Sequence, residues 1–129
     1  MVRRILIKNS SIRQMAAEFL ENKNPKTADA IWNALPIEAH ANRWGEEIYF
    51  STSVNASVEQ AQEFVDIGDI AYWPPGKAFC IFFGRTPAST DGRPRAASEV
   101  NVFARTVGDA STFKKLRDGE RIVVEREKT

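Results

Sequence analysis

Six side chains in the middle and late parts of the chain could together bind a ligand. They supply aromatic surface, a carboxyl group, an amine and an amide: Glu47, Tyr49, Trp73, Lys77, Phe82 and Asn101. If residues 44–54 form a strand, Glu47 and Tyr49 point to one face and Glu46 points to the other. The two neighbouring carboxyl groups therefore cannot act as an acid–base pair. These residue types predict a cleft that holds a small molecule or a short peptide.

Several of these residues also have a purely structural explanation. Most Glu side chains in proteins are solvated, so Glu47 could be a surface or capping carboxylate. Trp73 begins the rigid loop Trp73-Pro74-Pro75-Gly76-Lys77, which could carry binding groups or could simply connect two strands. Asn101 could bind a ligand or satisfy loop backbone. The sequence leaves these alternatives open.

The sequence lacks the common patterns of catalytic and metal-binding residues. His40 is the single histidine and Cys80 the single cysteine, so no zinc ligand set and no internal disulfide can form. Cys80 lies in an apolar run, residues 79–83, which is typical of a buried and inert thiol. Lys77 lacks the glycine-rich spacing of a phosphate-binding loop. We therefore expect no metal and no cofactor.

Composition and charge indicate one globular domain that spans residues 1–129. Apolar residues make up 43% of the chain and charged residues 27%, and the formal net charge is +1. Such a balance gives no support to a nucleic-acid partner. No apolar run is long enough for a signal peptide or a membrane span. We expect a cytoplasmic protein, monomeric or homodimeric, with neither nucleic acid nor membrane as a partner.

Turn signals divide the chain into short segments, which is typical of a β-rich protein. Strands are expected at residues 2–8, 44–54, 65–67, 70–73, 79–83, 100–107 and 121–126. In the strand at 100–107, Val100, Val102 and Ala104 are expected to point inward. Helices are expected after Asn24-Pro25, ending at Pro36, and at residues 109–116.

Residues 12–20 fit two structures. Ile12, Met15, Ala16, Phe19 and Leu20 fall on one helical face, whereas Met15, Ala17 and Phe19 alternate as in a strand. The pattern by itself slightly favours the helix.

Three segments carry a resemblance to a known family: residues 44–52, 68–87 and 97–102. The central segment is long and of unusual composition, with Tyr72-Trp73-Pro74-Pro75-Gly76 in its middle. Together the segments resemble a family of small bacterial and archaeal proteins of unknown function with a cyclophilin-like barrel. The resemblance implies a closed eight-stranded β-barrel capped by two short α-helices. It also implies that residues 12–20 are a strand in a hairpin with residues 2–8.

The same resemblance suggests an alternative function. The apolar strand that ends in Phe82-Phe83 is similar to the strand that supplies the proline-pocket Phe of true cyclophilins, the peptidyl-prolyl isomerases. Residues 46–52 lack the Arg and His of their Phe-His-Arg signature, and their Gln-Gly-Gly-Asp turn is absent. We therefore expect a binding module first and an isomerase second. A non-catalytic assembly subunit that buries the same aromatic residues in a partner is a third hypothesis.

Overall fold

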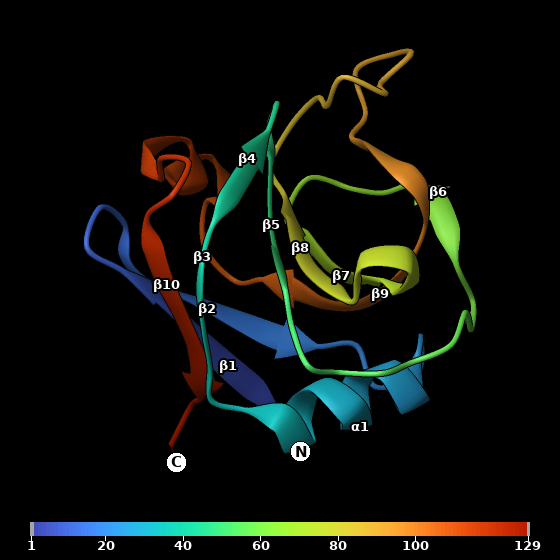
Figure 1. Cartoon of the computed structure of the whole chain (residues 1–129), viewed down its shortest axis with the longest axis vertical. Helices are drawn as coiled ribbons and strands as arrows, with labels where there is room; N and C mark the ends of the chain where they lie inside the picture. The colour runs from blue at the N-terminus through green and yellow to red at the C-terminus, as the bar shows by residue number, and fades with distance from the viewer. Residues whose placement is uncertain (1, 129) are drawn as a thin grey trace.

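The computed structural model describes residues 2–128, and within them β-strands dominate (Figure 1). In chain order the strands are β1 (Arg4–Asn9), β2 (Arg13–Phe19), β3 (Ile37–His40), β4 (Asn42–Trp44), β5 (Glu47–Ser51), β6 (Gln62–Phe64), β7 (Asp69–Trp73), β8 (Ala78–Phe82), β9 (Arg95–Thr106) and β10 (Arg121–Arg126). Helix α1 spans Pro25–Ala34, and two short 3-10 helices are η1 (Pro74–Gly76) and η2 (Ala110–Lys115). None of the helices in these residues is long and apolar enough to cross a membrane.

All ten strands belong to one antiparallel sheet that is strongly curved. Its order is β3-β10-β1-β2-β9-β7-β8-β5-β4, and β6 pairs with β9 outside this path. The expected closed barrel of eight strands is therefore wrong in both closure and strand number. The two ends of the path, β3 and β4, follow each other in the chain with Ala41 between them. They separate because β3 pairs with β10 whereas β4 pairs with β5.

Residues 12–20 form a strand, as the resemblance implied and the helical pattern did not. Strand β2 pairs with β1 from Arg4 opposite Glu18 to Asn9 opposite Arg13. Met15, Ala17 and Phe19 are buried and the residues between them are less so, which is the alternation of a half-buried strand. Met15 and Ala17 lie opposite Ile7 and Ile5 on β1, and this apolar pairing stabilises the strand although the residue spacing also fits a helix.

Other expected elements differ in detail. Of the segment 44–54, only residues 47–51 form the strand β5, while Trp44 ends the preceding strand β4 and a tight turn at Gly45-Glu46 joins the two. Residues 65–67 are not a strand, because the chain turns there and the Asp66 N–H donates to the Asp69 side chain over 2.9 Å. Residues 109–116 form the 3-10 helix η2 and not an α-helix, with Asp109 accepting the N–H of Ser111.

A β-bulge in β9 overturns the expectation that Val100, Val102 and Ala104 share one inward face. Ile70 on β7 lies opposite Ala104, but the next residue, Ala71, lies opposite Val102. Phe103 is thus an extra residue, and the side-chain alternation changes sign there. Ala104 and Phe103 belong to the central core, whereas Val102 and Val100 belong to a second apolar cluster on the other face of the sheet.

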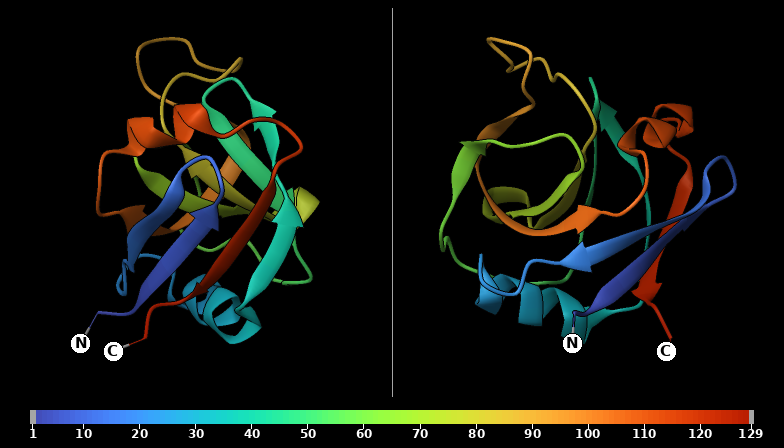
Figure 2. Two further views of the ribbon diagram at one scale, coloured as in Figure 1. Left: turned by 90° about the vertical axis from the view of Figure 1, so that its left-hand side faces the viewer. Right: turned by 180° about the vertical axis from the view of Figure 1, so that it is seen from behind.

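The central core fills the concave side of the sheet. Its rings include Phe50 and Phe79, stacked at 5.0 Å between centroids, and Phe103, edge-on to Phe79 at 5.6 Å. The second cluster lies between the outer face of β7 and β8 and the first part of β9. Figure 2 shows the curved path of β9, drawn in orange. The buried residues of the second cluster are Val65, Ala71, Ala78, Cys80, Phe82, Ala96, Val100 and Val102.

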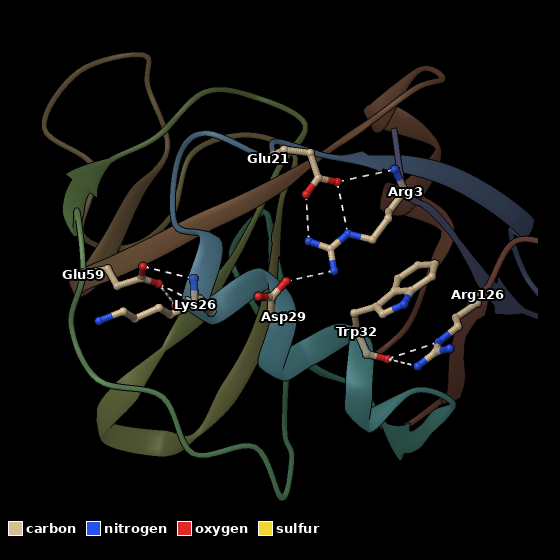
Figure 3. Close-up of polar contacts among 8 residues, drawn as sticks. Arg3, Glu21, Lys26, Asp29, Trp32, Glu59 and Arg126 are labelled. Atoms are coloured by element: carbon tan, nitrogen blue, oxygen red, sulfur yellow. Dashed lines mark hydrogen bonds and ion pairs between the residues drawn. The ribbon is translucent and has the colours of Figure 1, made fainter. Parts of the chain in front are cut away.

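Helix α1 covers one end of the core and is held at its N-terminus by a distant residue. Asn24 precedes the helix, but its side chain donates to the Val102 carbonyl over 2.7 Å and does not cap the helix. Glu59 takes this role: its carboxylate accepts the N–H groups of Lys26 (3.2 Å) and Thr27 (2.8 Å) (Figure 3). A carboxylate at this position interacts favourably with the helix dipole, and it accepts two N–H groups that have no partner within the helix.

The other end of α1 is fixed by two arginines that contact Trp32. Arg3 pairs with Glu21 at 2.7 Å and with Asp29 at 3.0 Å, and its guanidinium lies 5.5 Å from the Trp32 ring centroid (Figure 3). Arg126 donates to the Trp32 carbonyl over 2.9 Å. These contacts hold α1 against the residue before β1 and against β10. Arg3 and Arg126 therefore have a structural role here.

Candidate functional site

The outer face of β4, β5, β8 and β7 brings chemically active side chains together. Glu47 and Tyr49 lie two residues apart on β5, so their side chains share a face. Trp44 on β4 lies opposite Glu47, and Cys80 on β8 lies opposite Tyr49. Trp73, near the end of β7, lies opposite Ala78, the residue two before Cys80.

A pocket of about 250 Å³ opens on this face. Its lining residues are Trp44, Glu47, Tyr49, Trp73, Cys80, Ala96, Ala97 and Val100. The hollow forms because β8 carries small side chains, Ala78 and Cys80, at this point. Their cross-strand neighbours, Trp73 on β7 and Tyr49 on β5, carry large rings. The bent first part of β9 supplies the facing wall. The lining is mainly apolar, and Glu47 contributes the carboxyl group.

Glu47 is buried without a cationic partner. Its exposed fraction is 6%, and no Lys, Arg or His of residues 2–128 forms an ion pair with it. Burial raises the pKa of Glu47 to about 7, and hydrogen bonding to the neighbouring Cys80 thiol offsets this only in part. The group therefore titrates near neutral pH, where it can accept a hydrogen bond when ionised and donate one when protonated.

Cys80 is a buried thiol, as its apolar surroundings predicted. Burial raises the pKa of the Cys80 thiol well above its ordinary value, and the negative charge of Glu47 raises it further. Its sulfur lies 3.8 Å from the Ala78 carbonyl oxygen. A thiol held in its neutral form is a poor nucleophile, so Cys80 serves as a small, polarisable floor for the pocket.

The Trp73 ring is held by contacts on two sides. Its indole N–H donates to the Ser98 hydroxyl over 2.7 Å. Its six-membered ring packs on Gly76, where an added Cβ would lie 2.7 Å from Cζ3 of the indole. The diproline loop connects β7 to β8, and its Gly76 packs against the Trp73 ring that lines the pocket.

The turn between β4 and β5 places Trp44 beside Glu47. Gly45 has a φ of +61°, the left-handed region that glycine adopts without strain. A Cβ there would also lie 2.8 Å from Cδ of Pro87. Glu46, the second turn residue, points away from the pocket and pairs with Lys114 at 3.6 Å.

Comparison with known proteins identifies the family. A family model described as Cyclophilin-like matches residues 3–125. The chain belongs to the cyclophilin-like family. The solution structure of a hypothetical protein from Archaeoglobus fulgidus shares 46% sequence identity with this cyclophilin-like chain and superposes with a TM-score of 0.83. The match covers 98% of this chain and 95% of that one. No curated protein matches the chain.

Three of the six residues selected from the sequence line the pocket of this cyclophilin-like protein: Glu47, Tyr49 and Trp73. Phe82 is fully buried in the second apolar cluster beneath it. Lys77 is exposed, has a φ of 48° and ends η1 without lining the pocket.

Asn101 is fully buried on the far side of β9 from the pocket. Its amide donates to Thr27 Oγ1 and to the Ser57 carbonyl, both at 2.9 Å, and its oxygen accepts the N–H of Glu59 at 3.1 Å. These bonds hold the loop before β6 against α1. They match the loop-satisfying alternative that the sequence left open.

Five lining residues were not selected from the sequence: Trp44, Cys80, Ala96, Ala97 and Val100. Trp44 could have been found, because reading Gly45-Glu46 as a two-residue hairpin turn puts Trp44 opposite Glu47. Ala96, Ala97 and Val100 on β9 could not be found from residue spacing, because they approach the pocket only through the bend of that strand.

The pocket holds no cation of the kind an isomerase would use to stabilise a twisted amide. Four residues could have supplied one: Arg43, Lys77, Arg85 and Arg105. None of them lines the pocket. Arg43 donates to the carbonyl groups of Gly45, Lys114 and Leu116, and Arg105 pairs with Asp69 at 3.1 Å. Within residues 2–128, no group of three or more His, Cys, Asp or Glu side chains is arranged to hold a metal ion.

Proposed function

We propose that this protein binds a small molecule, or one side chain of a short peptide, in the pocket between β5, β8 and the bent start of β9. The observation that carries the proposal is Glu47: a carboxyl group that is 6% exposed, lines a cavity and has no cationic partner among residues 2–128. The three aromatic rings around the cavity add apolar contact area that a ligand could cover.

The energetics of Glu47 argue against a purely structural role. Ionising a carboxyl group whose pKa has risen from 4.5 to about 7 costs about 3 kcal/mol at alkaline pH. That is a large part of the roughly 5–15 kcal/mol by which domains are usually stable. An apolar residue would fill the site without this loss. A bound ligand that hydrogen-bonds or carries positive charge would recover it.

Thermal-shift screening of a small-molecule library tests the proposal. We expect a ligand that raises the Tm of the wild type and of Glu99→Gln, a control that alters an exposed carboxyl group on β9. The same ligand should have little effect on Glu47→Gln and on Trp73→Ala. A ligand that stabilises all four proteins equally binds elsewhere and would remove this pocket from the function.

A further inference from the structure

The pocket combines three aromatic rings with one buried carboxyl group. Trp44 and Tyr49 flank Glu47, one across the strand pair and one along the strand. Trp73 stands across the Cys80 floor. All three rings are half-buried, so each keeps part of its surface open to the cavity.

This combination has a definite electrostatic preference. The faces of aromatic rings carry negative potential and attract cations, most strongly where water is excluded. An ionised Glu47 adds a full negative charge, and none of the eight lining residues carries a positive one. The cavity therefore favours a cation with an apolar surface, because its other walls, Ala96, Ala97 and Val100, offer no hydrogen-bonding side chains.

We propose that the ligand presents a methylated ammonium group, which lies on the Cys80 floor among Trp44, Tyr49 and Trp73 with the Glu47 carboxylate as its counter-ion. This inference rests on the proposed ligand-binding function of the pocket and names the chemistry of its ligand. A quaternary ammonium group has no N–H to satisfy and exposes methyl groups to the rings, which is the chemistry that aromatic cages select.

The size of the pocket agrees with a head group. At about 250 Å³ it lies just below the range of about 300–1,000 Å³ typical of sites for drug-sized ligands. The pocket is partly open to solvent, so the rest of the ligand can leave through the mouth. The same head group can belong to a free quaternary amine or to a trimethylated lysine of a peptide, and the experiment below separates these sources.

Binding of such a cation must depend on pH, because the counter-ion titrates. The other titratable groups that face Glu47 are the Tyr49 phenol on β5 and the Cys80 thiol on β8. The residues that β4, β7 and β9 contribute to the lining carry none. With a pKa of about 7, Glu47 is about one tenth ionised at pH 6 and about nine tenths ionised at pH 8. Affinity for the cation should therefore rise by up to about tenfold between these two pH values.

Isothermal titration with choline and with its neutral isostere, in which a tert-butyl group replaces the trimethylammonium group, tests the inference. At pH 8 we expect choline to bind the wild type and Glu99→Gln at least about tenfold more tightly than the isostere. In Glu47→Gln the preference for choline should shrink to the smaller part that the three rings supply, and Trp73→Ala should lose both compounds. A peptide with one trimethyllysine, compared with its unmodified form, tests the peptide source. Circular dichroism of each variant confirms that it is folded.

The outcomes separate this inference from the function on which it rests. Equal affinity for choline and the isostere, with both lost in Trp73→Ala, would overturn the ammonium preference and leave the binding site standing. Choline binding that is unchanged in Glu47→Gln and Trp73→Ala would place the cation elsewhere and overturn the inference. No binding of choline or of the trimethyllysine peptide would overturn it too, while library screening tests the pocket independently. Binding of the peptide alone, dependent on Glu47, would support it and identify the peptide as the source.

Discussion

Glu47 and Asp69 are both buried carboxyl groups, but their surroundings are opposite. Asp69, at the start of β7, is 1% exposed and accepts hydrogen bonds from Nε of Arg105 at 3.1 Å and from the Asp66 N–H at 2.9 Å. Glu47, at the start of β5, is 6% exposed, lines a cavity and forms no ion pair with any Lys, Arg or His that the structure describes. Burial alone therefore does not tell the two acids apart, but their partners do. The paired acid fixes a turn, and we propose that the unpaired acid binds a ligand.

The largest effect that this comparison predicts is on stability when the structural acid is removed. Asp69→Ala removes a buried acceptor of two hydrogen bonds, from the Asp66 N–H and from Arg105 Nε. Arg105 keeps only its longer pairing with Asp66 at 3.5 Å. We expect the free energy of unfolding to fall by about 3 kcal/mol. Urea unfolding of the variant against wild type measures this. A loss below about 1 kcal/mol would mean that the pairing of Asp69 matters little.

The opposite change in stability is expected at Glu47, the carboxyl group that we propose binds the ligand. The pKa of Glu47 is raised in the folded state from 4.5 to about 7, so the folded protein holds the proton more tightly than the unfolded chain. The contribution of Glu47 to stability is therefore fully present below about pH 4.5 and is lost as pH rises through about 7. Glu47→Gln removes this loss and should be more stable than wild type by about 2 kcal/mol at pH 8, since the buried amide carries a smaller desolvation cost.

At pH 5 the two proteins should be nearly equal in stability. Urea unfolding at both pH values provides the test, and Glu99→Gln is the matched control, which should show no such pH-dependent gain. A Glu47→Gln variant that is less stable than wild type at pH 8 would show that the ionised carboxylate has a structural partner.

A smaller effect is expected at Gly76, where the Trp73 ring is positioned. Gly76→Ala places a Cβ 2.7 Å from the ring and must displace it. We expect a loss of about 1–2 kcal/mol in stability and a clear loss of ligand affinity. Gly92→Ala is the control, because nothing lies within 4 Å of a Cβ there. Equal ligand affinity in the two variants would show that the position of the ring does not define the pocket.

The smallest effect is expected at Lys77. Its side chain is exposed and does not line the pocket, so Lys77→Ala should change ligand affinity by less than about twofold. Calorimetric titration of the ligand found by screening measures this. A larger loss of affinity would show that Lys77 contacts the ligand and that the binding site extends beyond the pocket-lining residues.

The sequence predicted much of the fold because alternation and turn chemistry act locally. The strand at 121–126 and helix α1 follow from such patterns, and the family resemblance decided residues 12–20. The bulge at Phe103 could not be read in this way, because it depends on how β9 pairs with β7. Strands β3 and β4 were missed because Ile37 to Trp44 offers few β-branched residues, and its pairing partners are distant in sequence.

Part of the lining of the candidate pocket follows from the sequence for the same reason. Glu47 and Tyr49 share a face of one strand, a relation that residue spacing reveals. Cys80 was identified as a buried thiol, but its place on the pocket floor comes from cross-strand pairing with Tyr49. The bonds that Asn101 makes to Thr27 and Ser57 join segments distant in the chain, which spacing cannot reveal.

The carboxyl carbon of Glu47, followed by NMR in a protein with labelled glutamate, reports its titration directly. We expect an apparent pKa of about 7 in the free protein, well above the ordinary 4.5, and a fall in that value when a quaternary ammonium ligand is added. A Glu47 that titrates near 4.5 in the free protein would contradict it, because such a carboxylate would already be solvated or paired and would leave nothing for a ligand to satisfy.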